Sequence, residues 1–225
     1  MRVASVDPNE PRPDRLHEAV VVLDGGRLVA QPTETVYGLS ADAFNPEAVL
    51  ALNRLKQKPD RSPALLLLSG AEQLEQVAAA LPPVFADLMA MYWPGPLTLV
   101  VRAAPRLPQA VSGGRGTVAV RVPGLMLPRR LAAELGRPIT GVSANRHGEP
   151  SCRTALEVAR VFPEGVELIL DGGPAPGGLS STIVDVTVDP PRLQREGLLP
   201  VSSLRAFLPD LETGRRTPVG NSGGG

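Results

Sequence analysis

The sequence predicts a single α/β domain built around a large, twisted, mixed sheet. Segments with strand-like and helix-like patterns alternate along the chain, and no clear linker interrupts them before Gly197. Hydrophobic residues make up 43% of the 225 residues and charged residues 20%, enough apolar surface to close a core. Alternation of the two element types favours layers of helices on a sheet.

Helices are expected wherever apolar residues recur at a spacing of three and four. In the first of them, residues 15–24, two glycines end the pattern. In the second, Asn45 is a candidate N-cap and Pro46 takes the first helical position. The expected helices cover residues 15–24, 46–56, 71–80, 83–91, 127–135 and 154–162.

Strands are expected at short apolar or β-branched runs bounded by glycine and proline. Residues 64–68 form an uninterrupted apolar run, as a strand buried on both faces would. The second half of the chain is richer in such runs, and their order in the sheet does not follow from this pattern. The expected strands cover residues 28–31, 64–68, 97–102, 117–122, 139–143, 168–171, 182–188 and 193–195.

Composition and chain ends narrow the class of protein. Lysine and arginine total 23, as do aspartate and glutamate, which argues against nucleic-acid binding through bulk positive charge. One cysteine excludes an internal disulfide, and no apolar stretch approaches the roughly 18 residues of a membrane helix. We therefore expect a cytoplasmic protein with a flexible segment 1–14, a catalytic domain 15–208 and a disordered glycine-rich tail 209–225.

Polar clusters next to strand ends are the candidate functional sites. Residues 32–39 place two threonines, a glutamate and a tyrosine directly after a strand, either as a substrate-binding loop or as a turn in which Thr33 and Thr35 bond local backbone. Residues 56–63 hold three cations, including Lys56 and Lys58. They either complement a helix dipole or neutralise a phosphate.

Two further clusters follow the strands of the second half. Arg121 lies inside a β-branched run, where it either faces solvent or clamps a carboxylate or phosphate. Residues 141–151 end a buried strand in Ser143-x-Asn145 and a glycine turn. His147, in that turn, is either a general base or an incidental surface residue.

The remaining chemistry-bearing features point to an anion. Residues 171–182 form a loop rich in glycine and hydroxyl-bearing residues, and backbone N–H groups in such a loop can hold anions. Arg195 ends a later strand. No metal-ligand constellation is visible, and two histidines and one cysteine argue against a zinc site. No P-loop, nucleophile elbow or dinucleotide fingerprint is present. The residues alone therefore predict a cationic, hydroxyl-lined pocket for a phosphate-bearing ligand.

Taken in order, these clusters resemble the YrdC-like family of threonylcarbamoyl-AMP synthases. The motifs that carry the resemblance span about residues 15 to 200, and six or more in the right order are strongly specific. They are PTETVYGL at 32–39, LKQKP at 55–59, WPGPLTLV at 93–100, VAVRVP at 118–123, SANRHGEPS at 143–151, DGG at 171–173, SSTIVDV at 180–186 and REG at 195–197.

The resemblance implies a mostly parallel α/β sheet with a concave, positively charged central cavity. It implies that threonine, bicarbonate or CO2 and ATP form threonylcarbamoyl-AMP and pyrophosphate, with Mg²⁺ on the triphosphate and no organic cofactor. A downstream tRNA threonylcarbamoyltransferase complex would use the product. The chain looks like the family's short form, without an extra C-terminal domain.

The resemblance also assigns roles to individual residues. The catalytic tetrad maps onto Lys56, Lys58, Ser143 and Asn145. The ATP-side positions are Lys58, Ser62, Thr117, Ser143, Asn145, Ser151 and Arg195. The threonine-side positions are Thr35, Arg121, Gly141 and Ser181.

Three positions depart from the family pattern. Lys58 stands where the family has arginine, which keeps the charge and loses the bidentate fork. Ser62 stands where asparagine is usual, and Leu67 lies near the place where the family often has histidine.

Two alternatives remain open on the sequence. One is a related carbamoyl-chemistry paralogue, which the lysine at position 58 and the leucine at position 67 leave open. The other is a double-stranded RNA-binding module, or a synthase with weak RNA binding, because the family's cavity is positive. Net neutrality weighs against RNA binding.

Overall fold

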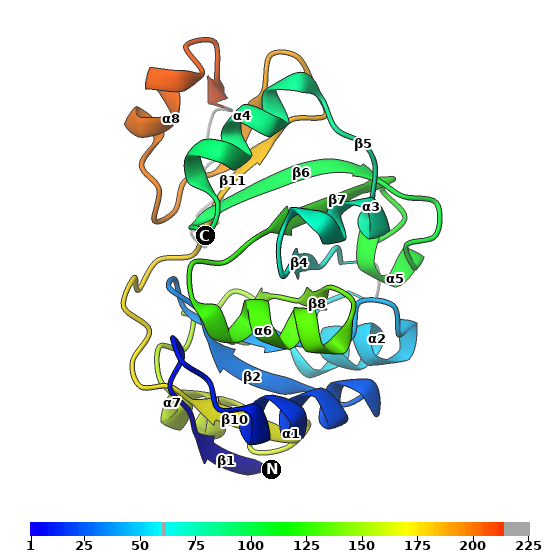
Figure 1. The fold of residues 1–225 in the computed structure, drawn as a ribbon, viewed down its shortest axis with the longest axis vertical. Coiled ribbons are helices and arrows are strands. Elements are labelled where there is room, and N and C mark those ends of the chain that lie inside the picture. Colours follow the sequence, from blue (N-terminus) through cyan, green and yellow to red (C-terminus); the bar gives the residue numbers. More distant parts are fainter. Residues whose placement is uncertain (60–61, 214–225) are drawn as a thin grey trace, which may run out of the picture.

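The structure is a computed structural model that describes residues 1–59 and 62–213. It has two sheets with helices packed around them (Figure 1). The smaller sheet has the order β1-β10-β2-β3-β9. Its strands are β1 (Arg2–Ser5), β10 (Leu168–Asp171), β2 (Val29–Pro32), β3 (Tyr37–Ser40) and β9 (Val142–Ser143).

The larger sheet has the order β13-β12-β11-β6-β7-β4-β8, with β5 paired to β6. Its strands are β13 (Glu212–Thr213), β12 (Arg192–Arg195), β11 (Thr182–Asp185), β6 (Leu97–Ala103), β7 (Thr117–Arg121), β4 (Leu65–Leu67), β8 (Ile139–Thr140) and β5 (Ala78–Ala80). The α/β class is confirmed.

Helices cover the small sheet and the interval between the sheets. Helix α1 (Pro13–Asp24) packs against α6 (Met126–Leu135), and α7 (Ala155–Val161) lies on β10 (Figure 1). Proline starts α1, and its buried residues Leu16, Ala19 and Leu23 lie on one face. Gly136, in the left-handed conformation at φ 74°, ends α6.

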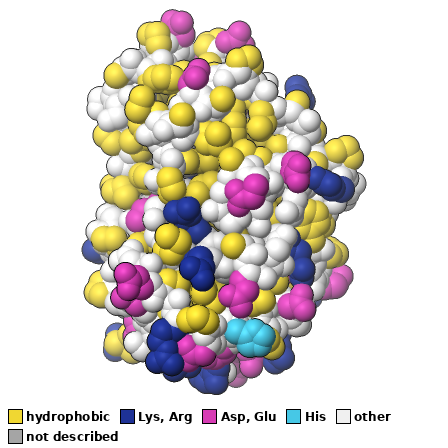
Figure 2. Space-filling view, viewed as in Figure 1, with side chains coloured by type: hydrophobic (Ala, Val, Ile, Leu, Met, Phe, Trp, Pro, Cys, Tyr) yellow, Lys and Arg dark blue, Asp and Glu magenta, His cyan; other side chains and the backbone are white. Residues whose placement is uncertain are grey.

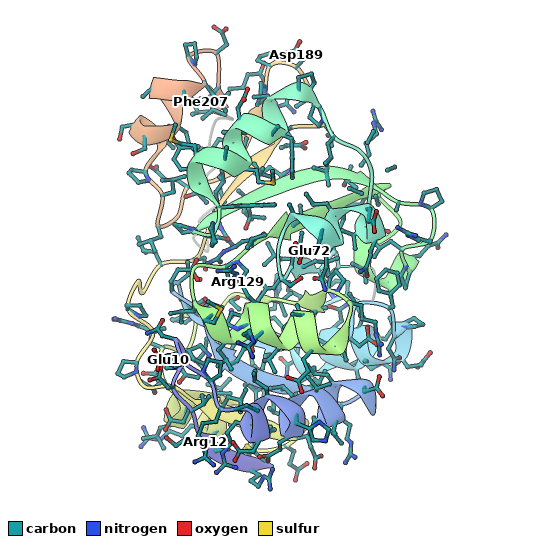
Figure 3. All side chains as sticks on the ribbon, in the orientation of Figure 1. Glu10, Arg12, Glu72, Arg129, Asp189 and Phe207 are labelled. Atoms are coloured by element: carbon teal, nitrogen blue, oxygen red, sulfur yellow. The ribbon has the colours of Figure 1, made fainter. Side chains whose placement is uncertain are left out.

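Six further elements complete the helical structure of the described residues. They are α2 (Pro46–Leu55), the 3₁₀ turn η1 (Ala71–Gln73), α3 (Leu74–Val77), α4 (Pro83–Tyr92), α5 (Gln109–Ser112) and α8 (Val201–Phe207). Asn45 caps α2 by accepting from the Ala48 backbone N–H at 3.2 Å, as expected. Arg129 of α6 reaches the η1 end: it donates to the Ser69 carbonyl at 3.2 Å, and Ser69 donates to Glu72 (Figure 3).

Two apolar cores follow from this layering. One lies between the small sheet, α1 and α6, and includes Leu16, Leu131 and Leu168. The other fills the large sheet and the side of the small sheet that faces it. Leu67 of β4 belongs to the first core, so the edge of the large sheet also packs against the small-sheet helices.

Gly141 is where the chain passes from one sheet to the other. The single strand expected over residues 139–143 is two strands: β8 pairs antiparallel with β4, and β9 pairs antiparallel with β3. Gly141 lies between them and donates its N–H to the Leu65 carbonyl at 2.7 Å. A Cβ at position 141 would lie 2.3 Å from Leu67 Cγ, so only glycine fits this crossing.

Other sequence-based expectations also need correction. The expected single, mostly parallel sheet is two sheets, and in the described residues five strand pairings are parallel and six antiparallel. Residues 2–5, expected to be flexible, form β1 parallel to β10. The helix expected over residues 71–80 stops at Val77, because the chain continues as β5 beside β6.

The expected tail 209–225 falls only partly within the described residues. Glu212 and Thr213 form β13 parallel to β12, so the fold continues past residue 208. Residues 214–225 lie outside the described part of the chain. In the described part, no helix combines the length and apolar character needed to cross a membrane.

We predict that Gly141→Ala destabilises the protein through overpacking against the buried Leu67 side chain. The expected loss is about 1–3 kcal/mol in the free energy of unfolding, measured by urea denaturation. Gly38→Ala is the matched control, because a Cβ there meets its nearest neighbour at 3.7 Å. Leu67→Ala removes the clash, so the double variant should lose less than the sum of the two singles. Full additivity would contradict this packing.

Candidate functional site

A pocket of about 220 Å³ lies where the two sheets meet, and it collects most of the predicted site residues. Its lining draws on the β2–β3 loop and β9 of the small sheet, and on β7, β12 and nearby loops of the large sheet. The structure therefore brings together segments more than 150 residues apart. The predicted residues that line it are Thr35, Lys58, Arg121, Gly141, Ser143, Ser181 and Arg195.

The other predicted residues lie outside the lining of this pocket. Asn145 contacts the lining residue Ser143, with Ser143 Oγ 2.6 Å from Asn145 Oδ1. Thr117 shares a face of β7 with Ala119 and Arg121, two and four residues along the strand, so it extends the same surface outward. Lys56, Ser62 and Ser151 complete the set outside the lining, and Arg61 lies outside the described residues.

Lys56 is an interior anchor. It is 1% exposed, and its Nζ donates to the Ser143 carbonyl, to the Asn145 carbonyl at 2.6 Å and to Asn145 Oδ1 at 3.1 Å. An ammonium group has three donors, and all three are used by protein oxygens. Lys56 therefore fixes the Ser143–Asn145 segment to the C-terminal end of α2, which was not evident from the sequence.

Lys56 and Lys58 are the only two lysines of the chain. Burial, followed by repulsion from Lys58, lowers the pKa of Lys56 to about 7. Burial, followed by the charge of Arg195, lowers the pKa of Lys58. Because Lys58 lines the pocket and Lys56 does not, a bound anion would be neutralised by Lys58 directly.

Asn145 has its side chain saturated by its neighbours. Its amide nitrogen donates to the Arg146 and Glu149 carbonyls, both at 2.8 Å, and its Oδ1 accepts from Lys56 and Ser143. These are all the hydrogen bonds that an asparagine side chain can make. Asn145 thus orients Ser143 for the pocket, with no donor left for a nucleotide in this arrangement.

Arg121 is buried and held on three sides. It is 2% exposed, its Nε donates to the Gly95 carbonyl at 2.9 Å, its Nη1 donates to Thr35 Oγ1 at 3.2 Å, and its Nη2 pairs with Glu34. Glu34 also accepts the Gly124 N–H at 2.8 Å. The carboxylate compensates a charge that would be costly to bury alone.

Arg195 lies across the pocket on β12 and contacts the loop before β11. Its Nη2 donates to the Ser181 carbonyl at 2.8 Å and lies 3.4 Å from Ser181 Oγ. Ser181 Oγ also lies 2.8 Å from Thr98 Oγ1. Burial, followed by the charge of Arg121, lowers the pKa of Arg195. Lys58, Arg121 and Arg195 therefore make a cationic pocket with Glu34 as the partner of one of them.

The turn offered as one interpretation of residues 32–39 is present, because Thr33 Oγ1 donates to the Val36 carbonyl at 2.7 Å. Thr33 is 4% exposed and also contacts Thr35 Oγ1 at 2.7 Å. Sequence reasoning missed the role of Glu34, because its partner Arg121 comes from the distant strand β7. His147, by contrast, is exposed and lies outside the pocket lining.

A larger cavity of about 460 Å³ lies elsewhere, at the end of the molecule marked by Asp189 in Figure 3. Prolines, valines and leucines dominate its lining, and its two charged residues are Asp189 and Asp210. A lining with carboxylates and no cation does not suit a phosphate or carboxylate ligand. Of these two cavities, the smaller cationic pocket suits such a ligand, and it is the candidate site because it collects the predicted residues.

Comparison with known proteins bears on the family of the chain. The Sua5/YciO/YrdC domain model, described as "Telomere recombination", matches residues 21–197. The chain is 40% identical over 186 residues to a threonylcarbamoyl-AMP synthase of Pyrococcus abyssi, covering 83% of this chain and 55% of that protein. It is 36% identical over 201 residues to a threonylcarbamoyl-AMP synthase of Bacillus subtilis, covering 89% and 57%. The chain thus spans little more than half the length of these relatives.

A solved structure extends the likeness to three dimensions. The crystal structure of P. abyssi Sua5 complexed with L-threonine matches with a TM-score of 0.91 at 36% identity, covering 95% of this chain and 63% of that one. The matched family model covers most of the chain, and the motifs of the candidate pocket fall within it. The chain belongs to the Sua5/YciO/YrdC family.

Proposed function

We propose that this protein is an L-threonylcarbamoyladenylate synthase, a nucleotidyltransferase that acts in tRNA modification. L-threonine, bicarbonate or CO2 and ATP give threonylcarbamoyl-AMP and pyrophosphate. The observation that carries the proposal is the single pocket lined by Thr35, Lys58, Arg121, Ser143 and Arg195. It is supported by relatives named threonylcarbamoyl-AMP synthase and by the likeness to a protein complexed with L-threonine.

The reaction needs positioning and charge neutralisation more than a protein nucleophile. The neutral amine of threonine adds to CO2 and loses one proton to solvent, which gives a carbamate. A carbamate oxygen then forms a bond to the α-phosphorus, and the bond from that phosphorus to the bridging oxygen breaks. The electron pair and the negative charge leave with pyrophosphate. Lys58 and Arg195 are placed to offset the charge on the phosphates, in a pocket where fixed donors act strongly.

The pocket is smaller than the roughly 300–1,000 Å³ typical of small-molecule sites. At about 220 Å³ it fits the amino-acid carbamate and the reacting phosphate more readily than a whole nucleotide. We infer that the rest of ATP lies outside, over the β7 surface that carries Thr117. Ser62 and Ser151 remain proposed nucleotide contacts.

Mg²⁺ enters this proposal as part of the nucleotide substrate. Within residues 1–59 and 62–213, no group of three or more His, Cys, Asp or Glu side chains gathers in a way that could hold a metal ion. Glu34, a carboxylate beside the pocket, is paired with Arg121. The residues therefore suit an ion carried by the triphosphate, with Lys58 and Arg195 contacting other phosphate oxygens.

The departures from the family pattern have local consequences. Lys58 supplies a point charge without the planar fork of arginine, so it can neutralise one phosphate oxygen without fixing its orientation. Leu67 is 1% exposed and lies against Gly141, so it offers threonine no polar contact. Threonine recognition then depends on Thr35, Arg121 and Ser181.

Partners and location follow as parts of the same proposal. A downstream tRNA threonylcarbamoyltransferase complex would consume the product in the cytoplasm, where ATP and tRNA occur together. Weak RNA binding is not favoured by the face shown in Figure 2, where Lys and Arg side chains are interspersed with Asp and Glu. We therefore propose no RNA-binding role for that face.

The first test removes a pocket cation. Arg195→Gln should abolish threonylcarbamoyl-AMP formation, detected by mass spectrometry after incubation with threonine, bicarbonate, ATP and Mg²⁺. Arg192→Gln, on the same strand and paired with Glu212 outside the pocket, is the matched control and should retain activity. Wild-type protein should give no product when any one substrate is omitted. Wild-type turnover in Arg195→Gln would refute the site.

The second test separates the two lysines. Lys56→Met removes the Lys56 donor from the Ser143 and Asn145 carbonyls and leaves Asn145 Oδ1 with Ser143 as its donor. The free energy of unfolding should therefore fall by about 2 kcal/mol or more, along with activity. Lys58→Met should weaken ATP binding, measured by calorimetry, with little loss of stability because Lys58 repels Arg195. Equal destabilisation by both substitutions would contradict these separate roles.

A further inference from the structure

The hydroxyl of Thr35 is held in one direction by Thr33. Thr33 Oγ1 lies 2.7 Å from the Val36 carbonyl oxygen and 2.7 Å from Thr35 Oγ1. A carbonyl oxygen can only accept, so the single hydroxyl proton of Thr33 lies between Thr33 and Val36. If Thr33 donated to Thr35 instead, two acceptor oxygens would face each other at 2.7 Å without a proton. Thr35 must therefore donate to Thr33, whose oxygen also has longer contacts with the Thr35 and Val36 N–H groups at 3.2 and 3.3 Å.

This arrangement makes Thr35 an acceptor toward the pocket. Its only proton is committed to Thr33, and Arg121 Nη1 donates to one of its two lone pairs at 3.2 Å. One lone pair remains for a ligand. Thr35 is 2% exposed and lines the pocket, so few water molecules can compete for its hydroxyl group and change this orientation.

Ser143, on the neighbouring strand β9, has the same polarity. Both amide hydrogens of Asn145 are used by carbonyl groups, and its Oδ1 faces the Lys56 ammonium. The 2.6 Å contact between Ser143 Oγ and Asn145 Oδ1 therefore takes the Ser143 proton. Two hydroxyls that line the pocket thus present lone pairs, whereas Lys58 and Arg195 present donors.

We propose that Thr33 is a positioning residue that makes Thr35 a hydrogen-bond acceptor for the amino acid substrate's N–H or O–H group. The proposal rests on the proposed function and deepens it. A phosphate or carboxylate oxygen next to Thr35 would place two lone pairs against each other, which is repulsive. Anionic groups of the substrates therefore bind the cations of the pocket instead. The amine, its carbamate N–H and the side-chain hydroxyl are the donors that threonine offers.

The test is calorimetric titration of the full chain with L-threonine, and separately with ATP. Thr33→Val and Thr35→Val should each weaken threonine binding about tenfold, the loss expected for one hydrogen bond. The double variant should bind threonine within twofold of Thr35→Val, because Thr33 acts through the Thr35 hydroxyl. Thr33→Ser keeps the hydroxyl and should bind as wild type does. ATP affinity should stay within twofold throughout.

Three results would overturn the proposal. The first is that Thr33→Val weakens threonine binding as much in the Thr35→Val variant as in the wild-type protein. Thr33 would then support only the turn, through the Thr35 and Val36 N–H groups. Thr33→Val could leave threonine binding unchanged, or it could weaken ATP binding instead. Failure of the wild-type protein to bind threonine at all would count against the proposed function, which keeps the two failures distinct.

Ligand analogues give a second measurement that does not depend on folding of Thr33→Val. 3-Hydroxybutyrate lacks the amino group of threonine, and L-2-aminobutyrate lacks its hydroxyl. If Thr35 accepts from one of these groups, the preference for threonine over the matching analogue should fall about tenfold in Thr35→Val. Unchanged preference over both analogues would overturn the proposal.

Discussion

The ammonium of Lys56 is the interaction on which the site's geometry depends. It is buried, yet its three donors meet the Ser143 and Asn145 carbonyls and the Asn145 side chain, which offsets part of the cost of removing a charge from water. These bonds hold the end of α2 against β9, and so place the Lys58 loop beside the small sheet. Together with the His147 N–H, which donates to the Lys56 carbonyl at 3.0 Å, they fix the cationic loop relative to the segment that carries Ser143.

The pocket combines cations with oriented hydroxyl groups, and the two kinds of group suit different parts of the substrates. Burial, and then the positive charge of a neighbouring arginine, lowers the pKa of Lys58 and of Arg195. An anionic ligand next to these groups favours their charged forms, so it should bind where the cations gather. Thr35 and Ser143 offer lone pairs instead, which gives the amino acid a place distinct from the phosphates.

Much of this could be predicted from the sequence, because local patterns carry it. The apolar run of β4, the proline-led start of α2 and the order of the motifs were enough for the fold class and for the convergence of Thr35, Lys58, Arg121 and Arg195. The division of residues 139–143 between two sheets was not predictable, because it depends on Gly141 meeting Leu67 from a distant strand. The burial of the Lys56 side chain was also not predictable, because the oxygen atoms that it contacts lie about 90 residues away in the sequence and are mostly backbone carbonyls.

The measurement that tests this account most directly is a ¹⁵N NMR titration of lysine-labelled protein, with and without ATP. The chain has two lysines, so the spectrum contains only Lys56 and Lys58. In the free protein, the pKa of Lys56 should be about 7 and that of Lys58 below its ordinary value. ATP should raise the pKa of Lys58, because a phosphate next to the ammonium favours the charged form. A pKa of Lys58 that ATP leaves unchanged would contradict the placement of the nucleotide in this pocket.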